Sequence, residues 1–382
     1  MLGRLGQPPV LGELLAGVLL GNLGLLGITG LEPLRDSGTL RLVAEVGAIL
    51  LLFEVGVESD LVQLLKVGWS SLLVATLGVI APMILGYLVS NWMVPDAGWL
   101  THLFVGGTLT ATSVGITARV LKDLGKANTK EAHIILGAAV ADDVIGLVVL
   151  AVVSGLVASV SSGASAGVLP VIWIVVKASL FLILAVIVGR FWSQRIFVHA
   201  ARLRVAGALL ALCIAFCFTV AGIAALVGLA PIVGAFAAGV VLEETHYKPF
   251  VDRGERRIEE LLFPITTIMV PIFFVAMGMR VDLRGFASPA VLGFAALITL
   301  VAVAGKQICG LGVLERGVDR LVIGLGMIPR GEVGLIFAGL GSSLSIGGRP
   351  VLSSMTFSSL VLMVMLTTFI TPPLLKIGFD RK

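Results

Sequence analysis

Apolar segments long enough to cross a lipid bilayer as helices follow one another along almost the whole chain. Charged residues make up only 13% of the sequence, whereas soluble domains average about 25%. Clusters of Gly, Pro or charged residues separate twelve candidate spanning helices. These helices cover residues 9–27, 39–57, 66–92, 100–121, 131–158, 168–192, 205–226, 229–244, 257–279, 288–314, 318–341 and 350–376. The sequence therefore predicts an all-α polytopic membrane protein whose surroundings are lipid.

The basic residues predict how the chain is oriented in the membrane. Of 27 Lys and Arg residues, 19 fall on one side, five on the other and three inside the candidate helices. Because cytoplasmic loops are enriched in Lys and Arg, both termini are predicted to be cytoplasmic. The formal net charge of +4 reflects this loop bias and does not indicate a nucleic-acid partner.

Two adjacent aspartates, Asp142 and Asp143, lie in the middle of the fifth apolar segment. Each charge at mid-bilayer costs roughly 2.5–3.5 kcal/mol on insertion scales, so such residues usually bind ions or relay protons. Consecutive helical side chains point about 100° apart, so one carboxylate can pair with a cation while the other faces a water-filled cavity. Lys306, deep in the tenth segment, is the expected counter-charge. A carboxylate that binds either a proton or a small cation would support antiport.

An internal repeat relates the two halves of the chain. Residues 9–20 match residues 231–242 at an offset of 222, and the same offset pairs Gly56 with Gly278. The repeats begin at the first and eighth helices, which predicts opposite orientations in the membrane, an arrangement typical of secondary transporters. Within a single membrane domain, 1–382, repeat one covers about 1–158, a linker helix 168–192 and repeat two 205–376.

The repeat also predicts a helix that the sequence lacks. The counterpart of segment 205–226 would lie upstream of Met1. The chain is therefore expected to start one helix late, through truncation or a late start codon, unless it is a genuine twelve-helix variant.

Two segments, the fourth and the eleventh, contain helix-breaking or polar residues near their middles. The fourth carries Thr112, Ser113 and Thr117, and the eleventh carries Pro329, Arg330 and Glu332. Proline removes a backbone hydrogen bond and clashes with the preceding turn. Paired discontinuous helices in corresponding repeat positions indicate an ion site near the midplane. Arg330 and Glu332 are interpreted as mainly structural.

Five motifs in this order resemble the cation:proton antiporter superfamily, most closely the NapA-type bacterial Na+/H+ antiporters. The motifs are TATSVGITARVL from Thr110, GAAVADDVIGLVVLA from Gly137, GLAPIVGAF from Gly228, Gly305-Lys306 and PRGEVGLI from Pro329. The resemblance covers essentially the whole chain. It implies a thirteen-helix fold with a dimerisation domain, a mobile core domain and two crossed discontinuous helices. It also implies a homodimer in the cell (inner) membrane.

The resemblance assigns roles to individual residues. Asp143 would carry Na+ (or Li+) and protons in competition, and Asp142 would form a salt bridge with Lys306 that changes with protonation. Thr112 and Ser113 would lie at the first crossing. The two-aspartate pattern resembles electrogenic members that work by elevator-type alternating access, without a cofactor. The chain departs from the pattern at Ala141 and Glu54.

Three other functions compete with Na+/H+ antiport. K+/H+ exchange stays open, because the spacing of ligand oxygens decides selectivity and sequence does not give it. An intramembrane aspartyl protease needs its two aspartates on separate helices, whereas these are adjacent, so an enzyme is disfavoured. A channel would lack obligatory coupling.

Overall fold

The computed structural model describes residues 9–27, 32–35, 37–58, 68–161, 168–201, 207–242, 244–252, 255–284 and 288–381. Within these ranges the chain is mostly helical, which confirms the predicted fold class at that level. The predicted segments hold the helices α1 (Pro9–Gly21), α3 (Gly38–Glu58), α5 (Trp69–Met93), α6 (Trp99–Thr108), α7 (Val114–Asp123), α8 (Lys130–Ser161), α9 (Val168–Ala201), α10 (Ala208–Leu226), α11 (Pro231–Val241), α13 (Ile258–Met279), α14 (Pro289–Ile308), α15 (Arg320–Gly326), α16 (Glu332–Ser343) and α17 (Ser354–Asp380). Shorter elements are α2 (Glu32–Arg35), α12 (Glu244–Val251), η2 (Leu23–Leu26), η4 (Cys309–Gly312), β1 (Ser345–Ile346) and β2 (Arg349–Pro350).

The long helices have the length and the surface expected of membrane spans. Seven helices in the described part of the chain are long and apolar enough to cross a membrane. In α5, Trp69 and Trp92 are 77% and 72% exposed and lie near opposite ends of the helix. At 1.5 Å per residue they are about 35 Å apart along the axis, close to the ~30 Å hydrocarbon thickness of a bilayer. Such exposed tryptophans are typical of the two membrane interfaces.

Two predicted segments are interrupted as expected, and another begins later than predicted. The fourth and eleventh segments each contain two short helices, α6 with α7 and α15 with α16, as the polar and helix-breaking residues near their middles predicted. The last segment was predicted to begin at residue 350, but α17 begins at Ser354 because β1 and β2 pair as an antiparallel hairpin. Gly347 and Gly348 have positive φ and form its turn, and the Ser353 side chain accepts a hydrogen bond from Thr356 N at the start of α17.

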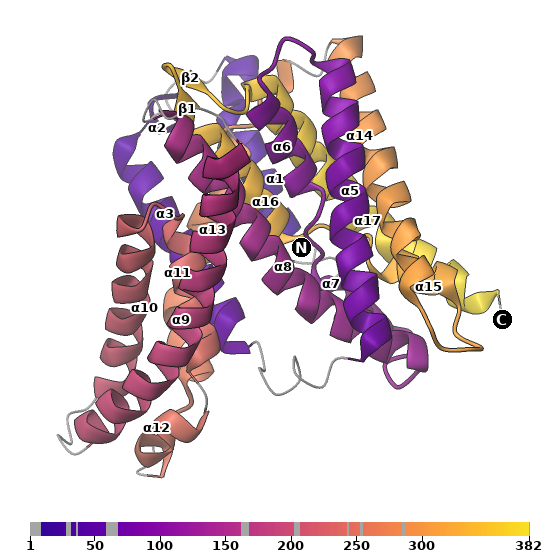
Figure 1. The fold of residues 1–382 in the computed structure, drawn as a ribbon. Coiled ribbons are helices and arrows are strands. Elements are labelled where there is room, and N and C mark those ends of the chain that lie inside the picture. Colours follow the sequence, from indigo (N-terminus) through magenta and orange to yellow (C-terminus); the bar gives the residue numbers. More distant parts are fainter. Residues whose placement is uncertain are drawn as a thin grey trace. The chain divides into compact units, whose positions relative to one another are not determined.

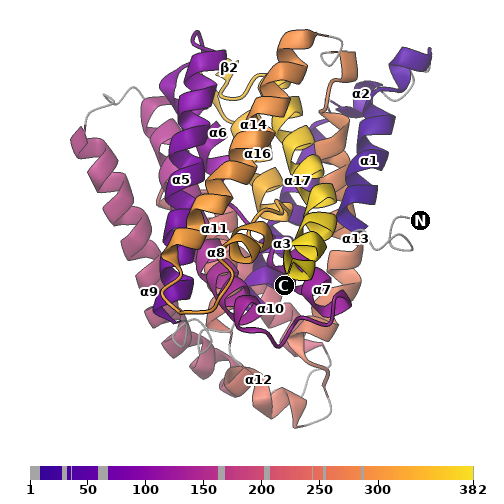
Figure 2. The ribbon, with the colours of Figure 1, turned by 90° about the vertical axis from the view of Figure 1, so that its right-hand side faces the viewer.

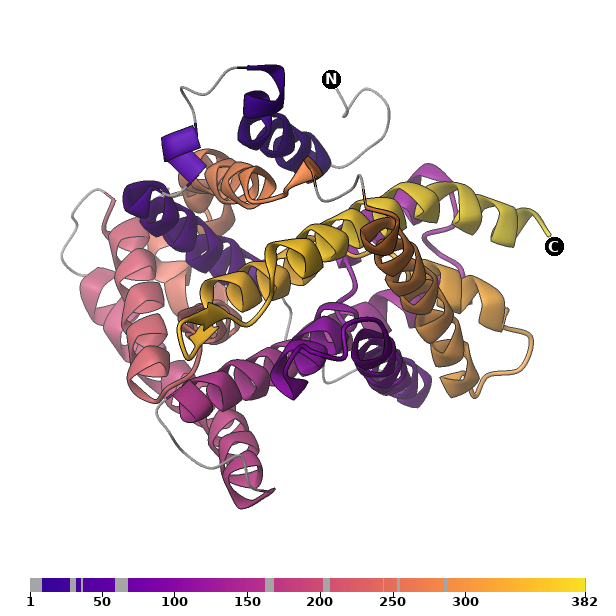
Figure 3. The same cartoon turned by 90° about the horizontal axis from the view of Figure 1, so that it is seen from above.

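The chain divides into two compact units, which are described separately. The first comprises Met1–Glu32, Val62–Val153 and Met277–Lys382, and the second comprises Pro33–Leu61 and Ser154–Ala276. In the first unit α14 packs against α5 on one side and α17 on the other, as Figures 2 and 3 show. Its core brings together buried apolar side chains from several helices: Val74 of α5, Leu121 of α7, Ile135 of α8, Ile323 of α15 and Leu375 of α17.

In the second unit α11 is the central helix. It packs against α3, α9 and α10, and these helices lie together in Figure 1. Every residue of α11 from Ile232 to Val241 is buried. A short helix that is apolar on all sides must be covered on all sides, which explains why three neighbours surround it.

Close backbone contacts between glycines join helices in both units. A Cβ at Gly56 in α3 would clash with the Phe236 carbonyl oxygen of α11 and lie 3.0 Å from Gly239 Cα. In the other unit, a Cβ at Gly278 in α13 would clash with the Leu14 carbonyl oxygen of α1 and lie 2.8 Å from Gly17 Cα. The 222-residue offset converts one contact into the other, residue by residue. Glycine is required where backbones approach this closely.

Lys177, the charged residue in the apolar first half of α9, lies beside the end of α10. A side chain added at Gly228, where φ is +80°, would meet Lys177 Nζ at 3.4 Å. Gly228 follows α10 directly, so the ammonium lies near the C-terminal end of that helix. Cations stabilise the negative end of a helix dipole, typically by about 0.3–1 kcal/mol at surface sites. This contact gives the lysine a structural role within its unit.

The glycine contacts predict a selective loss of stability. Gly56→Ala and Gly278→Ala should each lower the free energy of unfolding by about 1–3 kcal/mol, because the new methyl group meets backbone atoms that have no room to move. Thermal unfolding of the purified protein in detergent measures the effect. Gly222→Ala in α10 is the matched control, because a Cβ there meets open space. Equal melting temperatures for Gly56→Ala and the control would show that the contact is looser than described.

Candidate functional site

A fully buried ion pair joins α8 to α14. Lys306 Nζ lies 3.3 Å from both carboxylate oxygens of Asp142, and both side chains are 0% exposed. Gly78 of α5 leaves room for the ammonium, since a Cβ at that position would lie 3.3 Å from Nζ. Two buried charges tolerate this environment only as a pair, because desolvation penalises each of them by several kcal/mol.

Asp143 occupies a different environment from its neighbour. It is only partly buried, whereas Asp142 is completely enclosed. The two side chains project about 100° apart around α8, which accounts for the difference. One carboxylate is therefore held in an ion pair, while the other retains access to its surroundings at the same depth in the helix.

The two helix interruptions contact each other. Residues 109–113 separate α6 from α7, and residues 327–331 separate α15 from α16. Ser113 N donates to the Pro329 carbonyl oxygen at 2.8 Å. Thr117 Oγ1 donates to Gly326 O at 2.7 Å, and Thr112 Oγ1 donates to Met327 O at 3.3 Å. Residues in and just after the first interruption therefore donate to carbonyl groups in and just before the second.

Gly331 permits this close approach. A Cβ at Gly331 would lie 2.6 Å from both Cβ and Oγ of Ser113. Any larger residue would push the two non-helical segments apart. The glycine after Arg330 thus has a steric role that its position beside Pro329 in the sequence did not reveal.

Arg330 is completely buried and ties the second interruption to α14. Its Nη1 donates to Met327 O and its Nη2 donates to Ala302 O, both at 3.3 Å, while Nε has no hydrogen-bond partner among the described residues. Ala302 lies one helical turn before Lys306. The Arg330 carbonyl oxygen in turn accepts a hydrogen bond from Thr368 Oγ1 of α17 at 2.6 Å. Hydrogen bonds to α14 and from α17 therefore hold the second interruption in place.

The carbonyl oxygens of the two interruptions differ in how they are used. In the second interruption, protein donors occupy the carbonyls of Gly326, Met327, Pro329 and Arg330. In the first, no hydrogen bond within the described residues reaches the carbonyl oxygens from Thr110 to Thr112. Carbonyl oxygens are hard ligands suited to hard cations. The first interruption therefore offers a run of three such oxygens, whereas among residues 326–331 only the Ile328 carbonyl accepts no hydrogen bond within the described residues.

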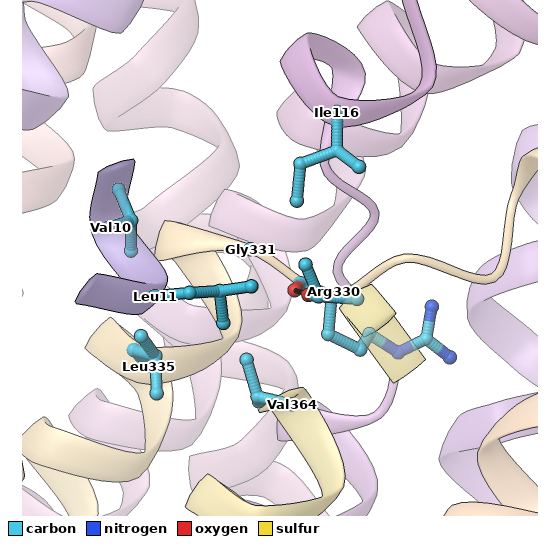
Figure 4. A pocket seen from close by; sticks show the side chains of 8 residues that line it. Val10, Leu11, Ile116, Arg330, Gly331, Leu335 and Val364 are labelled. Carbon is cyan, nitrogen blue, oxygen red and sulfur yellow. Dashed lines mark hydrogen bonds between the residues drawn. The ribbon is translucent and has the colours of Figure 1, made fainter. Parts of the chain in front are cut away.

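A cavity of about 30 Å³ lies beside the second interruption. Figure 4 shows the Arg330 guanidinium pointing away from the apolar side chains of Val10, Leu11 and Leu335. The volume is sufficient for a water molecule. Lining residues come from α1, α7, α16 and α17 as well as from the interruption: Val10, Leu11, Ile116, Arg330, Gly331, Leu335, Val364 and Thr368.

The structure places most of the predicted site residues in one unit. Asp142, Asp143 and Lys306 lie in the unit that also contains both interruptions. Glu332 begins α16, but its side chain lies outside the described residues. Thr368 and Ala302 were not predicted. Threonine side chains in helices commonly donate to a carbonyl of their own helix, as Thr367 does. The sequence therefore did not distinguish Thr368, which donates to another segment, from Thr367.

Comparisons with known proteins identify the family. The family described as "Sodium/hydrogen exchanger, transmembrane" matches residues 1–377. The chain is similar to the high-affinity Na+/H+ antiporter NhaS3 of Synechocystis sp., with 35% identity over 99% of this chain and 86% of the relative. It is also similar to the Na+/H+-K+ antiporter GerN of Bacillus cereus, with 36% identity over 99% of this chain and 92% of the relative.

A solved structure with the same fold is the sodium proton antiporter MjNhaP1 from Methanocaldococcus jannaschii. The match has a TM-score of 0.71 with 14% identity and covers 98% of this chain and 91% of the other. The resemblance inferred from five sequence motifs is confirmed at the level of the family, as is the prediction of a multi-pass membrane transporter rather than an enzyme. The chain belongs to the transmembrane sodium/hydrogen exchanger family, whose members are cation/proton antiporters.

Proposed function

We propose that this protein exchanges Na+ or Li+ for H+ and that both compete for the carboxylate of Asp143. The observation that carries the proposal is the partly accessible Asp143 next to the enclosed Asp142–Lys306 pair. A carboxylate held at membrane depth with access to its surroundings binds either a proton or a cation. Because the proton and the cation cannot occupy the Asp143 carboxylate together, the movement of one is coupled to the movement of the other. The names of the relatives NhaS3 and GerN support the same exchange.

The first interruption supplies the remaining cation ligands in this proposal. Its carbonyl oxygens from Thr110 to Thr112 accept no hydrogen bond within the described residues. Together with Asp143 they would replace part of the hydration shell of a sodium ion. The second interruption holds the first in place through its contacts with Thr112 and Thr117.

The Asp142–Lys306 pair sets the charge of the site in this proposal. With Asp142 neutralised by Lys306, Asp143 would supply a negative charge that a proton or Na+ neutralises. The strength of the salt bridge would change when Asp143 exchanges a proton for a cation. The two-aspartate pattern favours electrogenic exchange. K+ remains a second candidate substrate because GerN, at 36% identity, is named a Na+/H+-K+ antiporter.

The transport movement is proposed to be elevator-type alternating access by an inverted repeat with two crossed discontinuous helices. The equivalent glycine contacts at Gly56 and Gly278 support the repeat, and the hydrogen bonds between the interruptions support the crossing. Asp142, Asp143 and Lys306 lie in the same compact unit, as expected if that unit moves as a rigid body. We further propose a homodimer in the cell (inner) membrane with both termini cytoplasmic.

Asp143→Asn is expected to abolish exchange, because an amide neither binds a proton at neutral pH nor offers a negative charge to a cation. The assay is a dye-reported ΔpH in proteoliposomes, with Na+, Li+ and K+ added separately. Asp96→Asn, in an exposed loop, is the matched control and should transport like the wild type. Near wild-type activity of Asp143→Asn would show that Asp143 is not the group that binds the proton and the cation. Comparable rates with K+ and Na+ would favour the second substrate.

The buried pair predicts a non-additive loss of stability. Lys306→Met leaves Asp142 buried and unpaired and should lower the free energy of unfolding by about 3–5 kcal/mol, whereas Asp142→Leu/Lys306→Met should lower it less. Thermal unfolding of purified protein compares the single and double variants. In transport assays Asp142→Asn should shift the pH profile. A double variant that loses as much stability as the two single variants added together would contradict the pairing.

A further inference from the structure

Glu131, in the first turn of α8, makes a contact that the transport site does not use. The side chain is only 8% exposed although it lies at the end of a helix. Its Oε1 accepts a hydrogen bond from the backbone N of Asp319 at 3.2 Å. Asp319 directly precedes α15, the helix that ends at the second interruption. The contact thus joins the helix of the aspartate pair to the helix that leads into the second interruption.

The start of α15 suits a carboxylate partner. The Asp319 side chain itself accepts hydrogen bonds from Leu321 N and Val322 N. The first N–H groups of a helix lack partners within the helix and carry a partial positive charge, so carboxylates are favoured there. Two carboxylates share this end of α15, one from the helix itself and one from α8.

A second contact joins the same two helices at the other end of α15. A Cβ at Gly326 would lie 2.5 Å from Ile135 Cδ1, so the isoleucine side chain packs directly on the glycine backbone. Ile135 lies one helical turn after Glu131 on α8. Together the polar contact at Asp319 and the apolar contact at Gly326 fix the register of α8 along α15. Apolar packing alone tolerates sliding, whereas a hydrogen bond to a single N–H does not.

The register controls where the aspartates lie relative to the second interruption. Asp142 and Asp143 follow Glu131 by three helical turns, which is about 16–18 Å along α8. At the far end of α15, the carbonyl oxygens of Gly326 and Met327 bind the first interruption. A shift of α8 along α15 would therefore move Asp143 relative to the ligand oxygens of both interruptions.

We propose that Glu131 is a positioning residue for cation binding, acting through its hydrogen bond to Asp319 N and not through its charge alone. This inference rests on the function proposed above, in which Asp143 binds the cation. Glu131→Ala removes the acceptor and the charge, whereas Glu131→Gln removes the charge and keeps an oxygen that accepts from the same N–H. The two variants therefore separate the two contributions.

The experiment measures Na+-dependent proton movement in proteoliposomes over a range of Na+ concentrations. Glu131→Ala should raise the apparent KM for Na+ by roughly tenfold, the equivalent of about 1.4 kcal/mol, while Glu131→Gln stays within about twofold of the wild type. Glu260→Ala is the matched control, because Glu260 is an exposed carboxylate in the first turn of α13 and should leave KM unchanged. A purely structural role would reduce the amount of active protein without changing KM.

Hydrogen exchange gives a readout that is independent of transport. The amides at the start of α15 should exchange faster in Glu131→Ala than in Glu131→Gln or the wild type. If Glu131→Ala does not fold, Glu131→Asp replaces it. That variant keeps the charge but is one methylene shorter, so it should raise KM and speed exchange.

Three outcomes would overturn the inference. Unchanged KM and exchange in folded Glu131→Ala would show that the contact positions nothing. Equal KM increases in the alanine and glutamine variants would assign the effect to charge. If the wild type exchanges no Na+ for protons, both the proposed function and this inference are wrong. If the wild type is active but the Glu131 variants behave like it, only this inference is wrong.

Discussion

The buried ion pair between Asp142 and Lys306 is the interaction on which the other features of the site depend. Neither charge can remain at that depth alone, so α8 and α14 must keep the two groups within 3.3 Å of each other. Gly78 makes room for the ammonium, and Ala302, one turn before Lys306, accepts a hydrogen bond from Arg330. The pair and Arg330 therefore connect the aspartate helix, α14 and the second interruption. In the function we propose, they leave Asp143 as the carboxylate that binds the proton or the cation.

The two interruptions perform different tasks in this arrangement. The second one is largely satisfied, since hydroxyl, guanidinium and backbone donors occupy the carbonyl oxygens of Gly326, Met327, Pro329 and Arg330. An unsatisfied carbonyl in an apolar interior is costly, so these hydrogen bonds stabilise a break that Pro329 enforces. The first interruption supplies two of those donors, while its carbonyl oxygens from Thr110 to Thr112 accept no hydrogen bond within the described residues. A well-satisfied segment beside unengaged carbonyl oxygens suits the cation site that we propose.

Sequence patterns predicted the features that depend on local chemistry. Hydropathy located the helices, and the polar runs around Ser113 and Pro329 located both interruptions. The hairpin at residues 345–350 was missed, because its strands are two residues long and its turn depends on two glycines with positive φ. The partners of Arg330 were also missed. Ala302 and Thr368 are 28 and 38 residues away in sequence, and their bonds follow from helix packing that no local pattern encodes.

The central claim is that protons and the cation compete for the same carboxylate, and the pH dependence of the apparent KM for Na+ tests it most directly. The measurement uses wild-type proteoliposomes across the pH range in which protons inhibit exchange. Competition at one group predicts that KM rises by about tenfold for each unit that the pH falls, while the maximal rate at saturating Na+ is preserved. A KM that is independent of pH, with a maximal rate that falls instead, would contradict a shared binding group.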